Sequence, residues 1–280
     1  MMTDASRVFA VTLSYRRLGP AIKSWYEAQA YLTAAYPEVR LDWLHMTGTP
    51  PGSTDGHDIV TAKYREAQGI FLAGPWDVFV AIEDDMIIPP DTFTRLLALL
   101  DGGAHIGYGL YALRHGYPRW SAYTVLDERY GRSLSADEEL ARAAWGRVID
   151  VAGVGMGCTV IRRGVLEHFQ FQRRGQACND WYLAVDAQAA GLVQRCDCGL
   201  VCGHISLEPS PRVLWPDPDD PDLFRVEYLD PPDAAEQRRY AAWWQQREAA
   251  GLPVNSPKPR WLPATFFGQQ GGDHARDLHE

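Results

Sequence analysis

The chain has 280 residues, 46% of them hydrophobic and 22% charged, which is the balance of a globular protein large enough to bury a core. A formal net charge of -9 argues against bulk electrostatic capture of nucleic acid, although it leaves a nucleotide ligand open. No apolar run approaches the roughly 20 residues that cross a bilayer, and the N-terminus lacks the charge order of a secretory signal, so we expect a cytoplasmic protein without a membrane span.

Short apolar runs alternate with helical patterns over residues 7–205, which predicts an α/β domain. The first predicted elements are a strand at residues 8–12 and a helix at residues 20–36. A strand at residues 39–44, a loop at residues 47–56 and a helix at residues 58–73 follow. Asp58 is the expected N-cap of the last of these helices, and Gly74 with Pro75 ends it.

The clearest local pattern is an apolar strand at residues 76–82 that leads directly into Glu83, Asp84 and Asp85. A continuous apolar run, here residues 78–82, is typical of a strand buried on both faces, and open α/β sheets bind ligands beyond the carboxyl ends of their strands. Pro89, Pro90 and Asp91 then begin a predicted helix that Gly102 ends.

The second half of the domain begins with a predicted strand at residues 106–111 and an aromatic stretch that reaches Tyr123. A polar insertion is expected next, at residues 127–147, followed by two strands at residues 148–152 and 158–161. A helix at residues 179–190 and two further strands at residues 193–196 and 200–205 complete the domain. Gly153, Gly155 and Gly157 lie between the first two of these strands, where backbone would approach a ligand closely.

Five cysteines form an odd set in a chain too long to need disulfides, so free thiols are expected. Cys196, Cys198, Cys202 and His204 lie close together and suggest a zinc site. Their spacing lacks the paired C-x2-C of structural zinc sites, and we favour packing of small residues on a strand.

The composition changes after residue 205. Residues 209–233 are rich in proline and acid, which predicts an irregular linker or wrapping arm. Asp233 and Glu236 resemble a capping box before a helix that reaches about Ala250. We therefore expect a main domain at residues 1–205, and at 206–280 an arm whose helix packs on it.

Three groups of residues carry candidate chemistry. Three carboxylates at a buried strand end repel one another unless a cation such as Mg2+ or Mn2+ joins them; the alternative is a solvated acidic turn. His204 ends the last strand, where it is either structural or a metal ligand. Asp180 begins a helix, where it either caps the helix or accepts a proton from an attacking hydroxyl.

The order of these features, over about residues 8–205, resembles the GT-A glycosyltransferases of the family 2-like bacterial and phage type. The resemblance implies a Rossmann-like α/β sandwich around a mostly parallel, mixed sheet. It also implies transfer of a sugar, with inversion, from a nucleotide-sugar donor to a hydroxyl acceptor, which would be a glycan, a small molecule or a modified nucleobase.

The resemblance assigns roles to residues. Asp85 and His204 would bind Mn2+ or Mg2+, and Asp180 would be the catalytic base. The donor, a UDP-sugar first and a GDP-sugar second, would contact the remaining matched positions: Thr12, Ser14, Tyr15, Arg16, Glu83, Asp84, Gly155, Met156 and Gly157.

The sequence departs from the family pattern at three places. Glu83 replaces the usual first aspartate, Asn179 replaces a glutamate, and residues 45–48 replace an acidic base-recognition segment, which leaves the donor base open. Two alternatives stay open: a metal-dependent nucleotidyltransferase, of whose glycine- and arginine-rich loop residues 15–19 are a faint version, and a non-catalytic carbohydrate-binding protein on the same scaffold.

Overall fold

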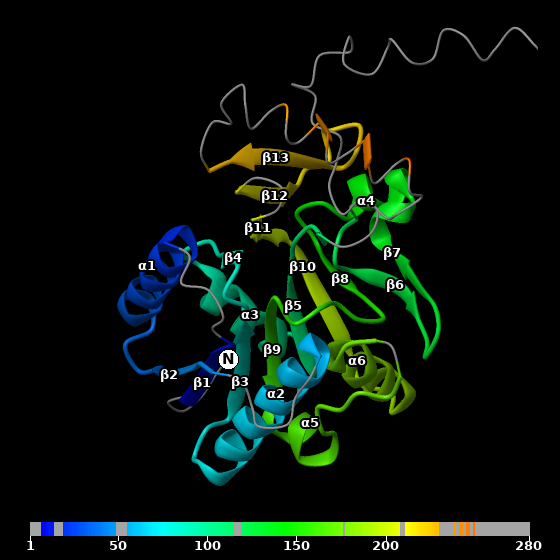
Figure 1. Cartoon of the computed structure of the whole chain (residues 1–280). Helices are drawn as coiled ribbons and strands as arrows, with labels where there is room; N and C mark the ends of the chain where they lie inside the picture. The colour runs from blue at the N-terminus through cyan, green and yellow to red at the C-terminus, as the bar shows by residue number, and fades with distance from the viewer. Residues whose placement is uncertain are drawn as a thin grey trace, which may run out of the picture.

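The computed structural model describes residues 7–13, 19–48, 55–114, 119–175, 177–207 and 211–229, with residues 238, 241, 242, 245, 246 and 249. Figure 1 shows a large sheet with helices around it and a smaller sheet above one end of its strands. A two-stranded hairpin, β6 (Tyr123–Leu126) with β7 (Gly131–Ser133), lies to one side.

The large sheet contains seven strands in the order β2-β1-β3-β9-β5-β10-β8. Its strands are β1 (Arg7–Leu13), β2 (Arg40–Met46), β3 (Val78–Ile82), β5 (Ile106–Leu110), β8 (Val148–Asp150), β9 (Cys158–Arg162) and β10 (Gln194–Val201). Strands β8 and β9 run antiparallel to their neighbours, and the other five share one direction. The predicted α/β class with a mostly parallel, mixed sheet is therefore confirmed.

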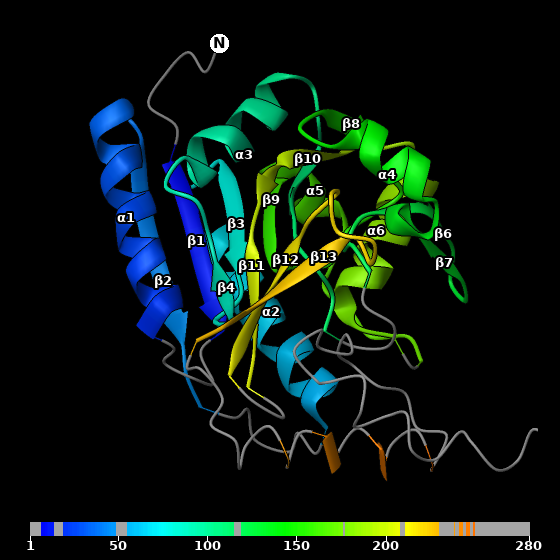
Figure 2. The ribbon, with the colours of Figure 1, turned by 90° about the horizontal axis from the view of Figure 1, so that it is seen from above.

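Helices cover both faces of this sheet (Figure 2). One face carries α1 (Gly19–Ala35) and α3 (Thr92–Asp101), and the other carries α2 (Gly56–Ala73), α5 (Arg163–His168) and α6 (Asn179–Ala189). The insertion after the hairpin adds a 3-10 turn, η1 (Leu134–Ala136), and the short helix α4 (Glu138–Ala144).

The alternation of side chains along the strands explains the two layers. Phe9 and Phe79 are register partners on β1 and β3, and both rings pack against Phe71 of α2. Trp43 of β2 points to the opposite face, where it meets Phe93 of α3 edge to face. Because successive side chains of a strand point to opposite faces, each buried strand contributes to both apolar layers.

The smaller sheet is antiparallel, with the order β13-β12-β11-β4. Its strands are β4 (Met86–Ile87), β11 (Gly203–Ser206), β12 (Arg212–Pro216) and β13 (Phe224–Tyr228). The prediction of an irregular segment at residues 209–233 was thus wrong for these last two strands. Val213 and Leu214 are fully buried, and pairing with β11 outweighs the proline- and acid-rich composition around them.

Local boundaries differ from the predictions in three places. Asp55, not Asp58, caps α2: its carboxylate accepts the backbone N–H of His57 at 2.7 Å. The two strands expected at residues 193–196 and 200–205 are instead β10 and β11, which divide at Cys202. Helix α5 was not predicted, because six residues are too few to show a helical period.

The C-terminal helix predicted at residues 233–250 lies largely outside the described residues, and the division at residue 205 stays a prediction. Among the described helices, none combines the length and apolarity that a membrane crossing requires. Cys158, Cys196, Cys198 and Cys202 are buried free thiols. None of them joins a metal-ligand cluster in the described part of the chain.

Candidate functional site

The end of β3 and the strand β11 meet at the acidic triplet. Strand β4 begins directly after Asp85, and it pairs with β11 so that Met86 lies opposite His204. The backbone N–H of Ile205 donates to the carbonyl of Asp85 at 2.8 Å. A short antiparallel pair thus fixes two segments that are far apart in the sequence.

Glu83, Asp85 and His204 form the cluster with metal-ligand geometry among the described residues, with one ligand atom of each within 4.8 Å of the others. His204 Nε2 lies 3.6 Å from Asp85 Oδ2. On the other side of the ring, Nδ1 lies 2.8 Å from the carbonyl of Ala112, so Nδ1 is the donor of that hydrogen bond and Nε2 faces the carboxylates.

Two buried atoms of this cluster, Asp85 Oδ1 and His204 Nε2, have no hydrogen-bond partner. A buried polar atom without a partner is costly, and a divalent cation would satisfy both at once. Two carboxylates and one imidazole suit Mn2+ and also accommodate Mg2+. The residues therefore fit a divalent metal ion.

The surroundings of the cluster shift the pKa values of its two carboxyl groups in opposite directions. Burial raises the pKa of Glu83 to about 8, with the negative charges of Asp85 and Asp180 adding to the effect. Burial acts in the same sense on Asp85, but His204 and the guanidinium of Arg114, which is hydrogen-bonded to Asp85 Oδ2, hold its pKa well below its usual value. Without metal at neutral pH, Glu83 therefore carries a proton and Asp85 is ionised.

A cavity of about 640 Å³ adjoins this cluster. Its lining includes Glu83, His204 and Arg114 on one side and Asn179 and Asp180 on the other. The cavity therefore opens both to the candidate metal ligands and to the candidate base.

Asp180 lies in the first turn of α6, where its Oδ1 accepts its neighbour Trp181's backbone N–H at 2.8 Å. Burial raises the pKa of Asp180, and hydrogen bonds from the backbone of Trp181 and Met156 partly oppose that shift. A carboxylate with a raised pKa is a stronger base once ionised, which suits proton transfer from a hydroxyl.

The glycine segment connects these groups. A Cβ atom at Gly155 would lie 2.2 Å from the hydroxyl oxygen of Tyr111 and 3.2 Å from Asp180 Oδ2, so this position accepts no side chain. Gly157 accepts the backbone N–H of Glu83 at 3.1 Å and donates its own N–H to the Tyr111 hydroxyl at 3.3 Å. The segment predicted to run beside the donor is thus bonded to the acidic turn.

Some predicted donor contacts lie away from this cavity. Thr12 is buried at the end of β1, where its hydroxyl accepts the indole N–H of Trp43 at 2.9 Å. Asp84 is also buried and does not line the cavity. Burial lowers the pKa of Lys63, and the negative charge of Asp84 partly opposes that shift. Ser14, Tyr15 and Arg16 lie outside the described residues.

Polar and aromatic lining residues that were not predicted individually include Tyr111, Arg114 and His57. Tyr111 belongs to the aromatic stretch noted in the sequence, whereas Arg114 and His57 carry no sequence signal. His57 lies 3.6 Å from the sulfur of Cys178, a pairing that suggests a nucleophilic thiol. Burial, with the charge of Asp180, raises the pKa of Cys178 to about 12, so the thiol stays protonated and this role does not fit.

Comparisons with known proteins give structural likenesses, among them the two described below. No family model matches the chain, and no curated protein matches it. A197 from STIV aligns with a TM-score of 0.49 and 18% identity, covering 81% of this chain and 95% of its own. A glycosyltransferase involved in glycosylation of the major capsid of PBCV-1 aligns with a TM-score of 0.33 and 10% identity, over 58% and 62% of the two chains. With both TM-scores below 0.5, conclusions about chemistry depend on the geometry of the site itself.

Proposed function

We propose that the chain is a metal-dependent glycosyltransferase that uses a nucleotide-sugar donor. The observation that carries this proposal is the position of one cavity between a two-carboxylate, one-imidazole cluster and an isolated buried carboxyl group, Asp180. The first group fits a cation that grips a diphosphate, and the second fits a base for the incoming hydroxyl.

Asp85, His204 and Glu83 would hold the ion, and a divalent ion there supplies Lewis-acid stabilisation of the leaving nucleoside diphosphate. Burial and the neighbouring carboxylates raise the pKa of Glu83, and the positive charge of a bound ion opposes both effects, so Glu83 gives up its proton when the ion binds. Arg114, already beside Asp85, adds a second positive charge facing the same cavity.

The transfer step breaks the bond between the anomeric carbon and the diphosphate oxygen and forms a bond from that carbon to the acceptor oxygen. Asp180 takes the acceptor's proton as the new bond forms, and the electron pair of the broken bond leaves with the diphosphate. Inversion at the anomeric carbon follows if the acceptor approaches from the side of Asp180. UDP-sugars are the first donors to test and GDP-sugars the second.

The test is release of free nucleotide from UDP-, GDP- and dTDP-sugars with Mn2+. We expect the wild type to hydrolyse at least one donor slowly, Asp85→Asn to abolish hydrolysis, and Asp180→Asn to retain donor binding while losing transfer by about 10²–10⁴-fold. Asp101→Asn, a matched change at an exposed acid of α3, should behave as the wild type.

Two outcomes contradict the proposal. A wild type that binds sugars and cleaves no donor would indicate a carbohydrate-binding protein. Formation of a nucleotide sugar from a nucleoside triphosphate and a sugar phosphate would indicate a nucleotidyltransferase.

A further inference from the structure

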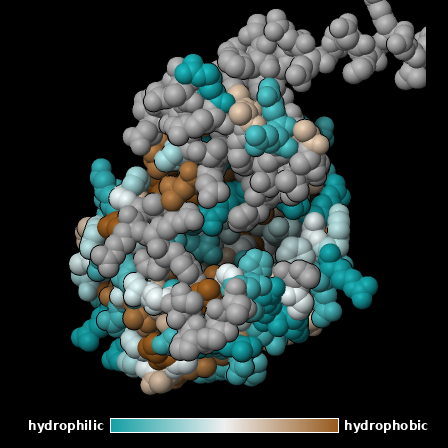
Figure 3. Space-filling model, viewed as in Figure 1, coloured by the Kyte–Doolittle hydropathy of each residue, from teal (hydrophilic) through white to brown (hydrophobic). Residues whose placement is uncertain are grey.

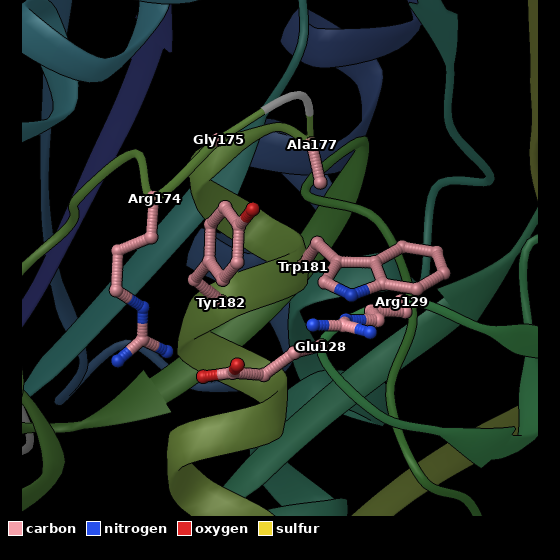
Figure 4. A pocket seen from close by; sticks show the side chains of 7 residues that line it. All are labelled: Glu128, Arg129, Arg174, Gly175, Ala177, Trp181 and Tyr182. Atoms are coloured by element: carbon pink, nitrogen blue, oxygen red, sulfur yellow. The ribbon is translucent and has the colours of Figure 1, made fainter.

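A second cavity, of about 580 Å³, has the lining residues shown in Figure 4. Trp181 and Ala177 line both cavities, so the two share a wall. In an α-helix, consecutive side chains point about 100° apart. The start of α6 therefore presents Asp180 to the first cavity and Trp181 to the boundary with the second.

The indole ring of Trp181 is held in place without a ligand. Its N–H donates to the carbonyl of Asp127 at 2.7 Å, and Tyr123 meets it edge to face at 5.4 Å between ring centroids. Gly131 makes room for it, since a Cβ there would lie 2.6 Å from the ring. A half-buried tryptophan fixed by three elements is a rigid apolar platform, and rigidity lowers the entropic cost of binding.

The remaining walls are polar and of mixed charge. Glu128 and Arg129 are exposed on the turn of the β6–β7 hairpin. Opposite them, the guanidinium of Arg174 lies 4.9 Å from the centre of the Tyr182 ring and pairs with Asp186 at 2.6 Å. Figure 4 shows these side chains around the same hollow as the Trp181 ring.

This combination favours one chemical class of ligand. A polyanion such as nucleic acid would meet Glu128 in the pocket and a chain of net charge -9 outside it. A pyranose ring instead has an apolar face that stacks on an aromatic side chain, and hydroxyl groups that both donate and accept hydrogen bonds. Carboxylate and guanidinium groups around one aromatic platform match that pattern.

We propose that this second cavity binds the acceptor, and that the acceptor is a saccharide stacked on Trp181 with one hydroxyl directed past it toward Asp180. The identification of this saccharide as the acceptor rests on the proposed function. The saccharide pocket itself rests only on the residues of the second cavity.

The test is binding of the full-length protein to a broad immobilised array of mono- and oligosaccharides, with Mn2+ and UDP present. We expect the wild type to bind a defined group of glycans. Trp181→Ala should weaken that binding at least about tenfold, as loss of a stacking aromatic does, while Trp181→Phe retains most of it. Tyr130→Ala is the matched control, because Tyr130 is an exposed aromatic residue of the same hairpin turn outside the cavity.

The results separate the two proposals. Absence of glycan binding by the wild type, or binding that Trp181→Ala leaves unchanged, overturns the saccharide pocket whether or not a donor is hydrolysed. Glycan binding that depends on Trp181, in a wild type that hydrolyses no donor, supports the pocket and removes the glycosyltransferase proposal.

Discussion

The pH dependence of metal binding follows from the raised pKa of Glu83. Since burial and neighbouring carboxylates raise that pKa to about 8, the group must lose a proton before it binds an ion below this pH. At about pH 6 roughly 1% of Glu83 is ionised, against about half at pH 8, so the Mn2+ association constant should rise about 50-fold between them. Asp85 is already ionised over this range and adds no pH dependence.

Isothermal titration calorimetry with Mn2+ at several pH values measures this slope, and buffers of different ionisation enthalpy count the released proton. Glu83→Gln removes the titrating group, so its affinity should be lower at pH 8 and should lose the part of the slope that Glu83 supplies. A wild-type affinity that stays flat between these pH values would refute the reasoning. If the Mn2+ affinity of Glu83→Gln keeps the pH dependence of the wild type, the proton released on metal binding comes from a group other than Glu83.

Three further predictions concern the same residues. Arg114→Ala leaves Asp85 with less compensation in the metal-free protein and should lower the free energy of unfolding by about 2 kcal/mol in urea with EDTA, a loss that Mn2+ recovers. Gly155→Ala should cost about 1–3 kcal/mol because its Cβ meets the hydroxyl of Tyr111, and adding Tyr111→Phe should restore part of the loss in the same assay. Because the folded state raises the pKa of Glu83 from 4.5 to about 8, the metal-free protein should lose thermal stability as pH rises through this window, and Glu83→Gln should lose less.

The sequence predicted the central sheet because its strands are buried on both faces. β3 and β9 are apolar over nearly their whole length, and only a buried strand tolerates that composition. The same logic located Glu83, Asp84 and Asp85 at a carboxyl end of the sheet, where ligands bind. The part of a site that follows directly after a buried strand can therefore be predicted from the sequence pattern.

Other parts depended on contacts that no local pattern encodes. Arg114 follows β5 on an irregular segment, and only the tertiary fold places it against Asp85. Strand β12 pairs with the edge of β11, and β13 pairs with β12; their own residues favour strands, but the proline- and acid-rich stretch around them hid that signal. Asp55 and Asp58 both suit an N-cap, and which one serves depends on where the backbone first becomes helical.

The pairing of β4 with β11 has a consequence for how the site forms. It joins the segments of Asp85 and His204 through backbone hydrogen bonds, so the two segments are held together without an ion. Glu83 is tied separately, through its N–H, to Gly157. The ion therefore meets a nearly complete set of ligands, and the cost of binding it lies in the proton of Glu83 rather than in backbone ordering.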